Sequence, residues 1–151
     1  MIRIIAVGKK HEAWVQIGIE RYQKRLRAPF DVEWVLLSHS SLEGAQARLE
    51  ESERLLARLR PADHVLLLDE TGKIYDSPAF ARSLNDAQTN GKSIVFVIGG
   101  AYGVDERIKQ RSDAVISLSG MVFPHQLVRL ILTEQLYRAQ EIARGGKYHH
   151  E

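Results

Sequence analysis

Two glycine-bearing segments could hold a ligand, because each directly follows an apolar run. Gly99 and Gly100 follow the run 94–98, and Gly120 follows the run 114–118. The first segment is not a P-loop, because no Gly-Lys-Ser/Thr follows, and its glycine spacing differs from the dinucleotide-binding fingerprint. Glycine still lets backbone approach a ligand closely, and ligands of open α/β sheets lie beyond the carboxyl ends of the strands. A small-molecule pocket is therefore favoured over plain turn chemistry at these segments.

Histidine, which titrates near neutral pH, is a candidate for acid–base chemistry, and the chain contains no cysteine. The absence of cysteine excludes a thiolate nucleophile, a disulfide and a Cys-based zinc site. His125 follows Pro124 at the start of a predicted helix, where the macrodipole opposes protonation of the imidazole; helix capping or packing is the plainer alternative. His149 and His150 in the tail either bind a metal weakly or are solvated. No Asp/Glu/His set has convincing metal-ligand spacing, so no metal site is expected.

Charge is distributed unevenly, although the net charge is only +2. Residues 1–30 hold seven basic and two acidic side chains, residues 31–90 hold six and eleven, and residues 91–151 hold eight and six. The basic first segment either faces nucleic-acid phosphates or is a solvated helix face. No run of about 18 apolar residues occurs, so we expect no membrane span and, by default, a cytoplasmic location.

The secondary-structure elements that must position these residues alternate between predicted strands and predicted helices along the whole chain. Apolar runs predict strands, and apolar residues at helical spacing predict helices. The sequence therefore predicts one α/β domain over residues 1–151 with a mostly parallel sheet. Ser77 is the expected N-cap of a helix with Pro78 at its first position, and Thr71-Gly72 is an expected turn. The expected strands are 2–7, 31–37, 65–68, 94–98 and 114–118, and the expected helices are 15–28, 42–60, 77–89, 104–111 and 125–143.

The last expected helix, 125–143, is apolar on more than one side. A helix on the surface of a monomer keeps a wider polar face. A second copy of the chain is the simplest partner for the extra apolar face, which predicts a homodimer. A central core helix in a monomer is the alternative.

Several characteristic motifs are spread over essentially the whole chain. The amino-terminal motif is Ile5-Ala6-Val7-Gly8-Lys9. The others are Ile98-Gly99-Gly100 with Tyr102-Gly103, Leu118-Ser119-x-Met121-x-Phe123-Pro124-His125-Gln126-x-x-Arg129, Glu134-Gln135-x-Tyr137-Arg138-Ala139 and Tyr148-His149. Together these motifs resemble the RlmH family of SPOUT methyltransferases.

The resemblance implies an enzyme that methylates N3 of a pseudouridine in large-subunit (23S) ribosomal RNA on the assembled ribosome, with S-adenosylmethionine as methyl donor. It also implies a homodimer and a carboxyl-terminal trefoil knot; chain-threading rules alone argue against a knot. The donor contacts of the family map onto Leu68, Gly99, Leu118, Ser119, Gly120, Met121, Val122 and Phe123.

The tail and the start of the last helix are the expected catalytic region. We expect His149 to remove the N3 proton and Tyr148 to stack on or bond to the base, while His125 and Arg129 orient the site or contact the RNA. Stabilisation of an anionic base by positive charge is an equal alternative to a true general base. The family often has a basic residue at position 150, where this chain has histidine, a titratable group.

Two other functions stay open at the sequence level. One is a non-catalytic RNA-binding or ribosome-assembly factor, which the basic first 30 residues would suit. The other is a SPOUT methyltransferase of transfer RNA, although such an enzyme usually carries an extra RNA-binding domain that 151 residues leave little room for.

Overall fold

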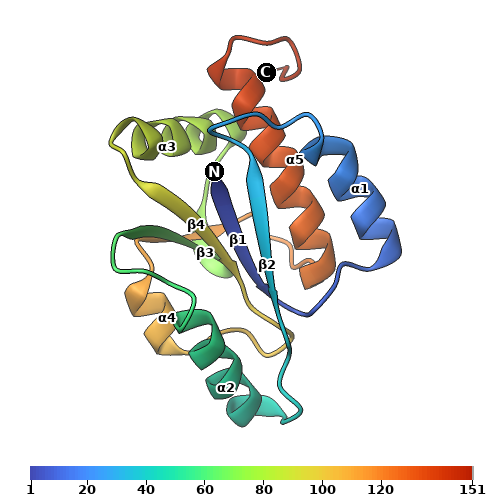
Figure 1. Cartoon of the computed structure of the whole chain (residues 1–151), viewed down its shortest axis with the longest axis vertical. Helices are drawn as coiled ribbons and strands as arrows, with labels where there is room; N and C mark the ends of the chain where they lie inside the picture. The colour runs from blue at the N-terminus through green and yellow to red at the C-terminus, as the bar shows by residue number, and fades with distance from the viewer. Residues whose placement is uncertain (151) are drawn as a thin grey trace.

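The structure is a computed structural model that describes residues 1–150; Glu151, the last residue of the predicted domain and tail, lies outside the described residues. Strands and helices alternate along the chain (Figure 1). The strands are β1 (Ile2–Val7), β2 (Val32–Leu37), β3 (Asp63–Ile74), β4 (Ser93–Ile98) and β5 (Ala114–Ser117). The helices are α1 (Ala13–Gln23), α2 (Gly44–Leu56), α3 (Ser77–Thr89), α4 (Glu106–Arg111) and α5 (His125–Ala143).

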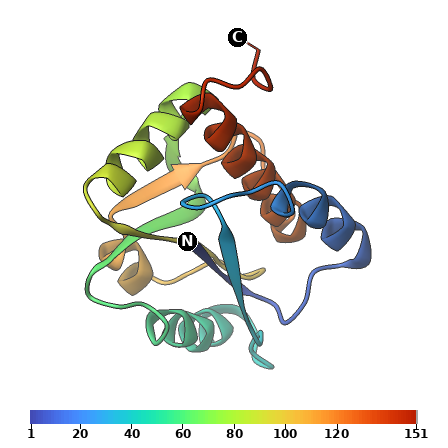
Figure 2. The ribbon, with the colours of Figure 1, turned by 45° about the horizontal axis from the view of Figure 1, so that its top comes forward.

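The five strands form one parallel sheet in the order β2-β1-β4-β3-β5. Side chains alternate between the two faces of a strand, so Phe96 of β4 enters one core while Val95 and Val97 enter the other. Helices α3 and α5 cover the first face, with α1 beside α5, and α2 and α4 cover the second (Figures 1 and 2). The predicted α/β fold with a parallel sheet flanked by helices is confirmed, whereas the trefoil knot stays a prediction.

Strand β3 continues past its predicted end at Leu68. Its pairing with β5 shifts in register between Leu68 and Lys73, both of which pair with Ile116. Residues 69–72 therefore bulge out of the ladder, where the sequence predicted a turn. The bulge puts Asp69 at the carboxyl end of the buried part of β3.

Helix α3 is capped one residue earlier than predicted. The Asp76 carboxylate accepts a hydrogen bond from the Ala79 N–H at 2.8 Å, so Asp76, not Ser77, is the N-cap. A carboxylate in this position satisfies a backbone N–H that the helix itself leaves unbonded. Ser77 instead donates from its hydroxyl to Gln135 Oε1 at 2.7 Å and thereby joins α3 to α5.

Helix α5 packs against the sheet between α1 and α3 (Figure 2). Leu132, Leu136 and Ala139 give it a fully buried face in the first core. The helix starts at the edge of the sheet where the parallel strands end and runs back to the edge where they begin (Figure 1). No helix within residues 1–150 has both the length and the apolar character that crossing a membrane requires.

Candidate functional site

A cavity of about 510 Å³ opens beyond the carboxyl ends of β3, β4 and β5. This is the edge where open α/β sheets bind ligands. Seven of the eight residues assigned to the methyl donor by resemblance line the cavity; Gly120 belongs to the same loop but is not among the lining residues. The seven are Leu68, Gly99, Leu118, Ser119, Met121, Val122 and Phe123.

The loop after β4 forms one wall of the cavity. It turns back on itself through a hydrogen bond from the Gly103 N–H to the Gly100 carbonyl at 3.0 Å. A Cβ on Gly99 would lie 3.0 Å from Val104 Cγ1 and 3.2 Å from the Gly103 carbonyl carbon. A side chain at position 99 would therefore press on Val104 and on the Gly103 backbone, and the loop would have to shift by a few tenths of an ångström to accept it.

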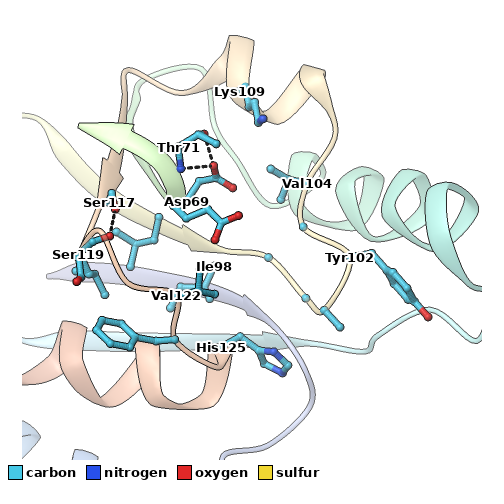
Figure 3. A pocket seen from close by; sticks show the side chains of 18 of the residues that line it. Asp69, Thr71, Ile98, Tyr102, Val104, Lys109, Ser117, Ser119, Val122 and His125 are labelled. Atoms are coloured by element: carbon cyan, nitrogen blue, oxygen red, sulfur yellow. Dashed lines mark hydrogen bonds between the residues drawn. The ribbon is translucent and has the colours of Figure 1, made fainter. Parts of the chain in front are cut away.

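The loop between β5 and α5 forms the opposite wall (Figure 3). The Ser117 hydroxyl donates to the Ser119 carbonyl at 2.7 Å, and the Ser119 hydroxyl accepts from the Met121 N–H at 3.0 Å. These two bonds shape the loop, so the Ser119 hydroxyl is already engaged by the backbone. Met121 and Val122 are 76% and 75% exposed, so this wall presents apolar surface to the solvent.

The cavity also has a charged rim that the sequence analysis missed. Asp69, Glu70 and Thr71 come from the bulge in β3 (Figure 3), while Arg48 and Lys109 come from α2 and α4. Asp69 accepts hydrogen bonds from both the backbone N–H and the hydroxyl of Thr71. The position of Asp69 directly after the apolar run 65–68 could have identified it, because polar residues at strand carboxyl ends lie at the ligand edge.

His125 lines the cavity at the first position of α5 (Figure 3). Burial lowers the pKa of its imidazole, and the positive charge of Arg129 lowers this pKa further. The negative charges of Glu12 and Glu51 act in the opposite direction but have smaller effects. The imidazole is therefore neutral near pH 7 and retains one nitrogen that can accept a proton or a hydrogen bond.

Arg129 lies one turn further along α5 and is fully buried. Its guanidinium donates to the carbonyls of Val7, Gly8 and Lys10 at 2.9, 3.2 and 3.1 Å. Gly8 has a φ of +122°, and a Cβ there would lie 2.7 Å from Arg129 Nη2. Burial lowers the pKa of Arg129. A role in orienting the site fits this location, but direct contact with RNA does not, because the guanidinium is buried against the turn after β1.

Tyr148 and His149 contact the second half of α5, at Glu134 and Arg138, whereas the cavity lies at the start of this helix. The carboxyl terminus lies near the far end of α5 (Figure 1). The Tyr148 hydroxyl donates to Glu134 Oε1 at 3.2 Å. From His125 to Glu134, α5 rises roughly 14 Å at 1.5 Å per residue. Burial, together with contacts to Tyr22 and Glu134, raises the pKa of Tyr148 to about 12. In this chain the tail does not close over its own cavity, because these contacts bind it to the second half of the helix.

The described part of the chain contains no candidate metal site. Residues 1–150 contain no group of three or more His, Cys, Asp or Glu side chains that could hold an ion.

Comparison with known proteins gives a consistent result. The family model described as "Predicted SPOUT methyltransferase" matches residues 1–149. Relatives from Pelotomaculum thermopropionicum, Exiguobacterium sp. and Flavobacterium johnsoniae are 43%, 42% and 40% identical to this chain. Each alignment covers at least 98% of both proteins, and each relative is named "Ribosomal RNA large subunit methyltransferase H". Because the model match and the relatives span nearly the full length, the chain belongs to the SPOUT methyltransferase family.

Proposed function

We propose that this chain transfers a methyl group from S-adenosylmethionine to N3 of a pseudouridine in large-subunit ribosomal RNA. The observation that carries the proposal is the cavity beyond β3, β4 and β5, which is lined by seven residues assigned to the methyl donor. The names of the relatives support large-subunit ribosomal RNA as the substrate. The choice of pseudouridine and of N3 follows from the resemblance of the sequence motifs.

The cavity suits S-adenosylmethionine in size and in chemistry. Its volume of about 510 Å³ lies within the range of small-molecule pockets. Ile98, Leu118 and Val122 offer apolar surface for the adenine ring, and Asp69 and Glu70 offer carboxylates for the positively charged end of the donor. These residues would hold the donor.

Alignment is the main task of the protein in this reaction. When bound, S-adenosylmethionine supplies a methyl carbon that its sulfonium charge already activates. N3 bonds to this carbon, the electron pair of the broken carbon–sulfur bond stays on sulfur, and the N3 proton leaves to a protein base or to water. The neutral imidazole of His125 at the cavity wall can orient the base by a hydrogen bond. Tyr148 and His149 act on the base from the tail.

A homodimer is the form in which we expect the enzyme to act. Trp14 and Ile17, three residues apart on α1, are 53% and 72% exposed and lie on the same side of the helix. Beside them lies a groove between α1 and α5 of about 350 Å³, lined mostly by apolar residues. A second copy that covers this face would bury both features, in agreement with the two-sided apolar character of α5. The groove residues are Gly18, Arg21, Tyr22, Leu127, Leu130, Ile131 and Glu134.

The dimer also supplies a way for the tail to reach a cavity. The tail and the cavity lie at opposite ends of α5 in one chain, so the tail of one copy serves the cavity of the other in this proposal. The basic segment 21–27 lies at the same end as the tail, because Gln140 of α5 bonds to the Arg27 N–H at 2.7 Å and to the Arg25 carbonyl at 3.1 Å. This segment would then meet RNA phosphates close to the target base.

The assembled ribosome in the cytoplasm is the proposed setting. A chain of 151 residues carries little surface for recognising RNA sequence, and an assembled ribosome supplies a shaped substrate instead.

Mass spectrometry of RNA nucleosides from a strain that lacks the gene tests the proposal. We expect one methylated pseudouridine of the large-subunit RNA to disappear and to return when the gene is restored, but not when a Gly99→Val copy is supplied. Loss of a methylated nucleoside from transfer RNA would contradict the choice of substrate. An unchanged set of methylated nucleosides would contradict catalysis and would favour a non-catalytic ribosome-assembly factor.

A further inference from the structure

Arg138 of α5 is held rigidly by a neighbouring carboxylate. Its Nε and Nη2 both donate to Glu134 Oε1, at 3.0 and 2.6 Å. Glu134 is fixed in turn, because the Gln135 side-chain amide donates to its Oε2 at 2.8 Å. Both side chains are largely buried, with exposed fractions of 24% for Arg138 and 18% for Glu134. A partly buried pair with two hydrogen bonds is better ordered than an isolated surface pair.

The third nitrogen of this guanidinium, Nη1, contacts the tail. Arg138 Nη1 lies 3.1 Å from Nδ1 of His149. The guanidinium carbon also lies 4.9 Å from the centre of the Tyr148 ring, which packs edge-on against Tyr137 at 4.8 Å. The same arginine therefore contacts both aromatic residues of the tail and fixes their orientation.

The contact with Nδ1 determines where the imidazole carries its proton. A guanidinium has only donors and is not deprotonated in proteins. Nδ1 of His149 must therefore be the acceptor, which puts the ring proton of the neutral imidazole on Nε2. In this arrangement the nitrogen opposite Arg138 is a hydrogen-bond donor, and the acceptor nitrogen is already occupied.

We propose that Arg138 is a positioning residue that presents His149 to the target base as an Nε2–H donor and not as a proton acceptor. This inference rests on the proposed function. In the imide of the base, N3 lies between two carbonyl groups, and loss of the N3 proton places negative charge on their oxygens. A donor aimed at one of these oxygens stabilises that charge. The N3–methyl bond forms as the carbon–sulfur bond breaks, and the N3 proton passes to water.

Replacement of His149 by glutamine separates the two roles. A glutamine side chain presents an amide N–H near the position of Nε2 but does not take up a proton at neutral pH. With assembled ribosomes as substrate, we expect His149→Gln to keep kcat within about tenfold of the wild type and His149→Ala to lose about a hundredfold or more. Equal losses in the two variants would overturn the proposal.

Arg138→Leu tests whether the arginine acts through the histidine. We expect it to lower kcat in the wild-type background and to cause little further loss in the His149→Ala background, because coupled residues are non-additive. Arg144→Leu is the matched control, since Arg144 is 63% exposed and pairs with Glu141 instead. Additive losses in the double variant would show a merely structural role for Arg138.

Nitrogen NMR of His149 in the intact protein gives a readout that does not require methylation. Under conditions where the imidazole is neutral, we expect the proton almost wholly on Nε2 in the wild type and a mixture of both tautomers in Arg138→Leu. A proton on Nδ1 in the wild type would refute the inference. The expected tautomer without any methylation of ribosomes would leave the inference about Arg138 standing and would count against the proposed function.

Discussion

At the scale of single residues, the site depends on Gly99, which has no side chain, and on Arg129, whose side chain is buried. Gly99 lets the wall loop fold tightly, and Arg129 donates to three carbonyls of the turn after β1. A buried carbonyl that loses its donor costs about 1–3 kcal/mol. The two residues therefore affect different quantities: Gly99 the shape of the cavity and Arg129 the free energy of unfolding.

Gly99→Val is expected to weaken donor binding. The Cβ of valine would lie 3.0 Å from Val104 Cγ1 and 3.2 Å from the Gly103 carbonyl carbon, so the wall loop would have to shift to accept the side chain. Calorimetry with S-adenosylmethionine should show an affinity at least about tenfold weaker, the equivalent of about 1.4 kcal/mol. Ala62→Val, an exposed position before β3, is the control and should bind normally. Normal binding by Gly99→Val would show that the donor lies elsewhere.

Two histidines give the fold a dependence on pH. Burial, with a smaller contribution from Arg129, lowers the pKa of His11 and of His125. In the unfolded chain these imidazoles take up protons near pH 6.5, whereas in the folded chain they stay neutral to lower pH. The unfolded state then binds more protons, so the free energy of unfolding should fall as the pH drops below about 6.5.

Urea titrations between about pH 7.5 and about pH 5 measure this fall. A variant with both His11→Gln and His125→Gln should lose part of the slope, because glutamine does not titrate. An identical slope in the wild type and the double variant would mean that other groups cause the pH dependence.

At the scale of elements, hydrophobic patterning predicted most of the fold but few of its details. The runs 2–7 and 94–98 became β1 and most of β4 because their residues alternate between two buried cores. The extension of β3 to Ile74 was missed, because a polar segment that rejoins a ladder after a bulge has no hydrophobic signal. The N-cap at Asp76 was missed because two adjacent residues, Asp76 and Ser77, both suit that position.

In the candidate site, too, some features could be predicted from the sequence and others could not. The walls of the cavity follow from glycines and strand ends, which are local features of the sequence. The clamp of Arg129 on the turn after β1 and the contact of Arg138 with His149 depend on the packing of α5. Sequence spacing does not report which partner a long cationic side chain will reach, because that partner is chosen by tertiary contacts.

Helix α1 provides the sharpest test of the dimer. Ile17→Glu should be harmless in a monomer, since Ile17 is 72% exposed, but it would bury an unpaired charge in the proposed interface. Sedimentation velocity should then report monomers for the variant and dimers for the wild type. Ile74→Glu, at a 58% exposed position at the end of β3, is the matched control and should stay dimeric. A dimeric Ile17→Glu protein would contradict this interface.

The basic segment 21–27 should control binding to ribosomes. Lys24 and Arg25 are exposed, and their reversal to glutamate removes two proposed phosphate contacts. We expect weaker ribosome binding and a slope of log affinity against log salt that is smaller by about two. Donor affinity, measured in parallel, should not change. A salt slope equal to that of the wild type would indicate that this segment is a solvated helix face that makes no phosphate contacts.

At the scale of the whole molecule, the position of the tail predicts that two chains share each site. Mixtures of His149→Ala and Gly99→Val subunits should recover activity, because a mixed dimer has one cavity and one tail that are both intact and face each other. With random pairing, about a quarter of all sites are then complete. Methylation assays on the re-associated mixture measure the recovery. No recovery above the separate variants would mean that each chain uses its own tail.

Arg129 connects residues that are synthesised at very different times. The donor on α5 and the acceptor carbonyl of Val7 are 122 positions apart in the chain. Synthesis proceeds from the amino terminus at about 5–20 residues per second, so the turn after β1 waits several seconds for the arginine that clamps it. Strand β1 must likewise wait for β4 before both of its edges are paired. A nascent chain that stops before α5 therefore has an unclamped turn after β1 and an uncovered apolar face of the sheet.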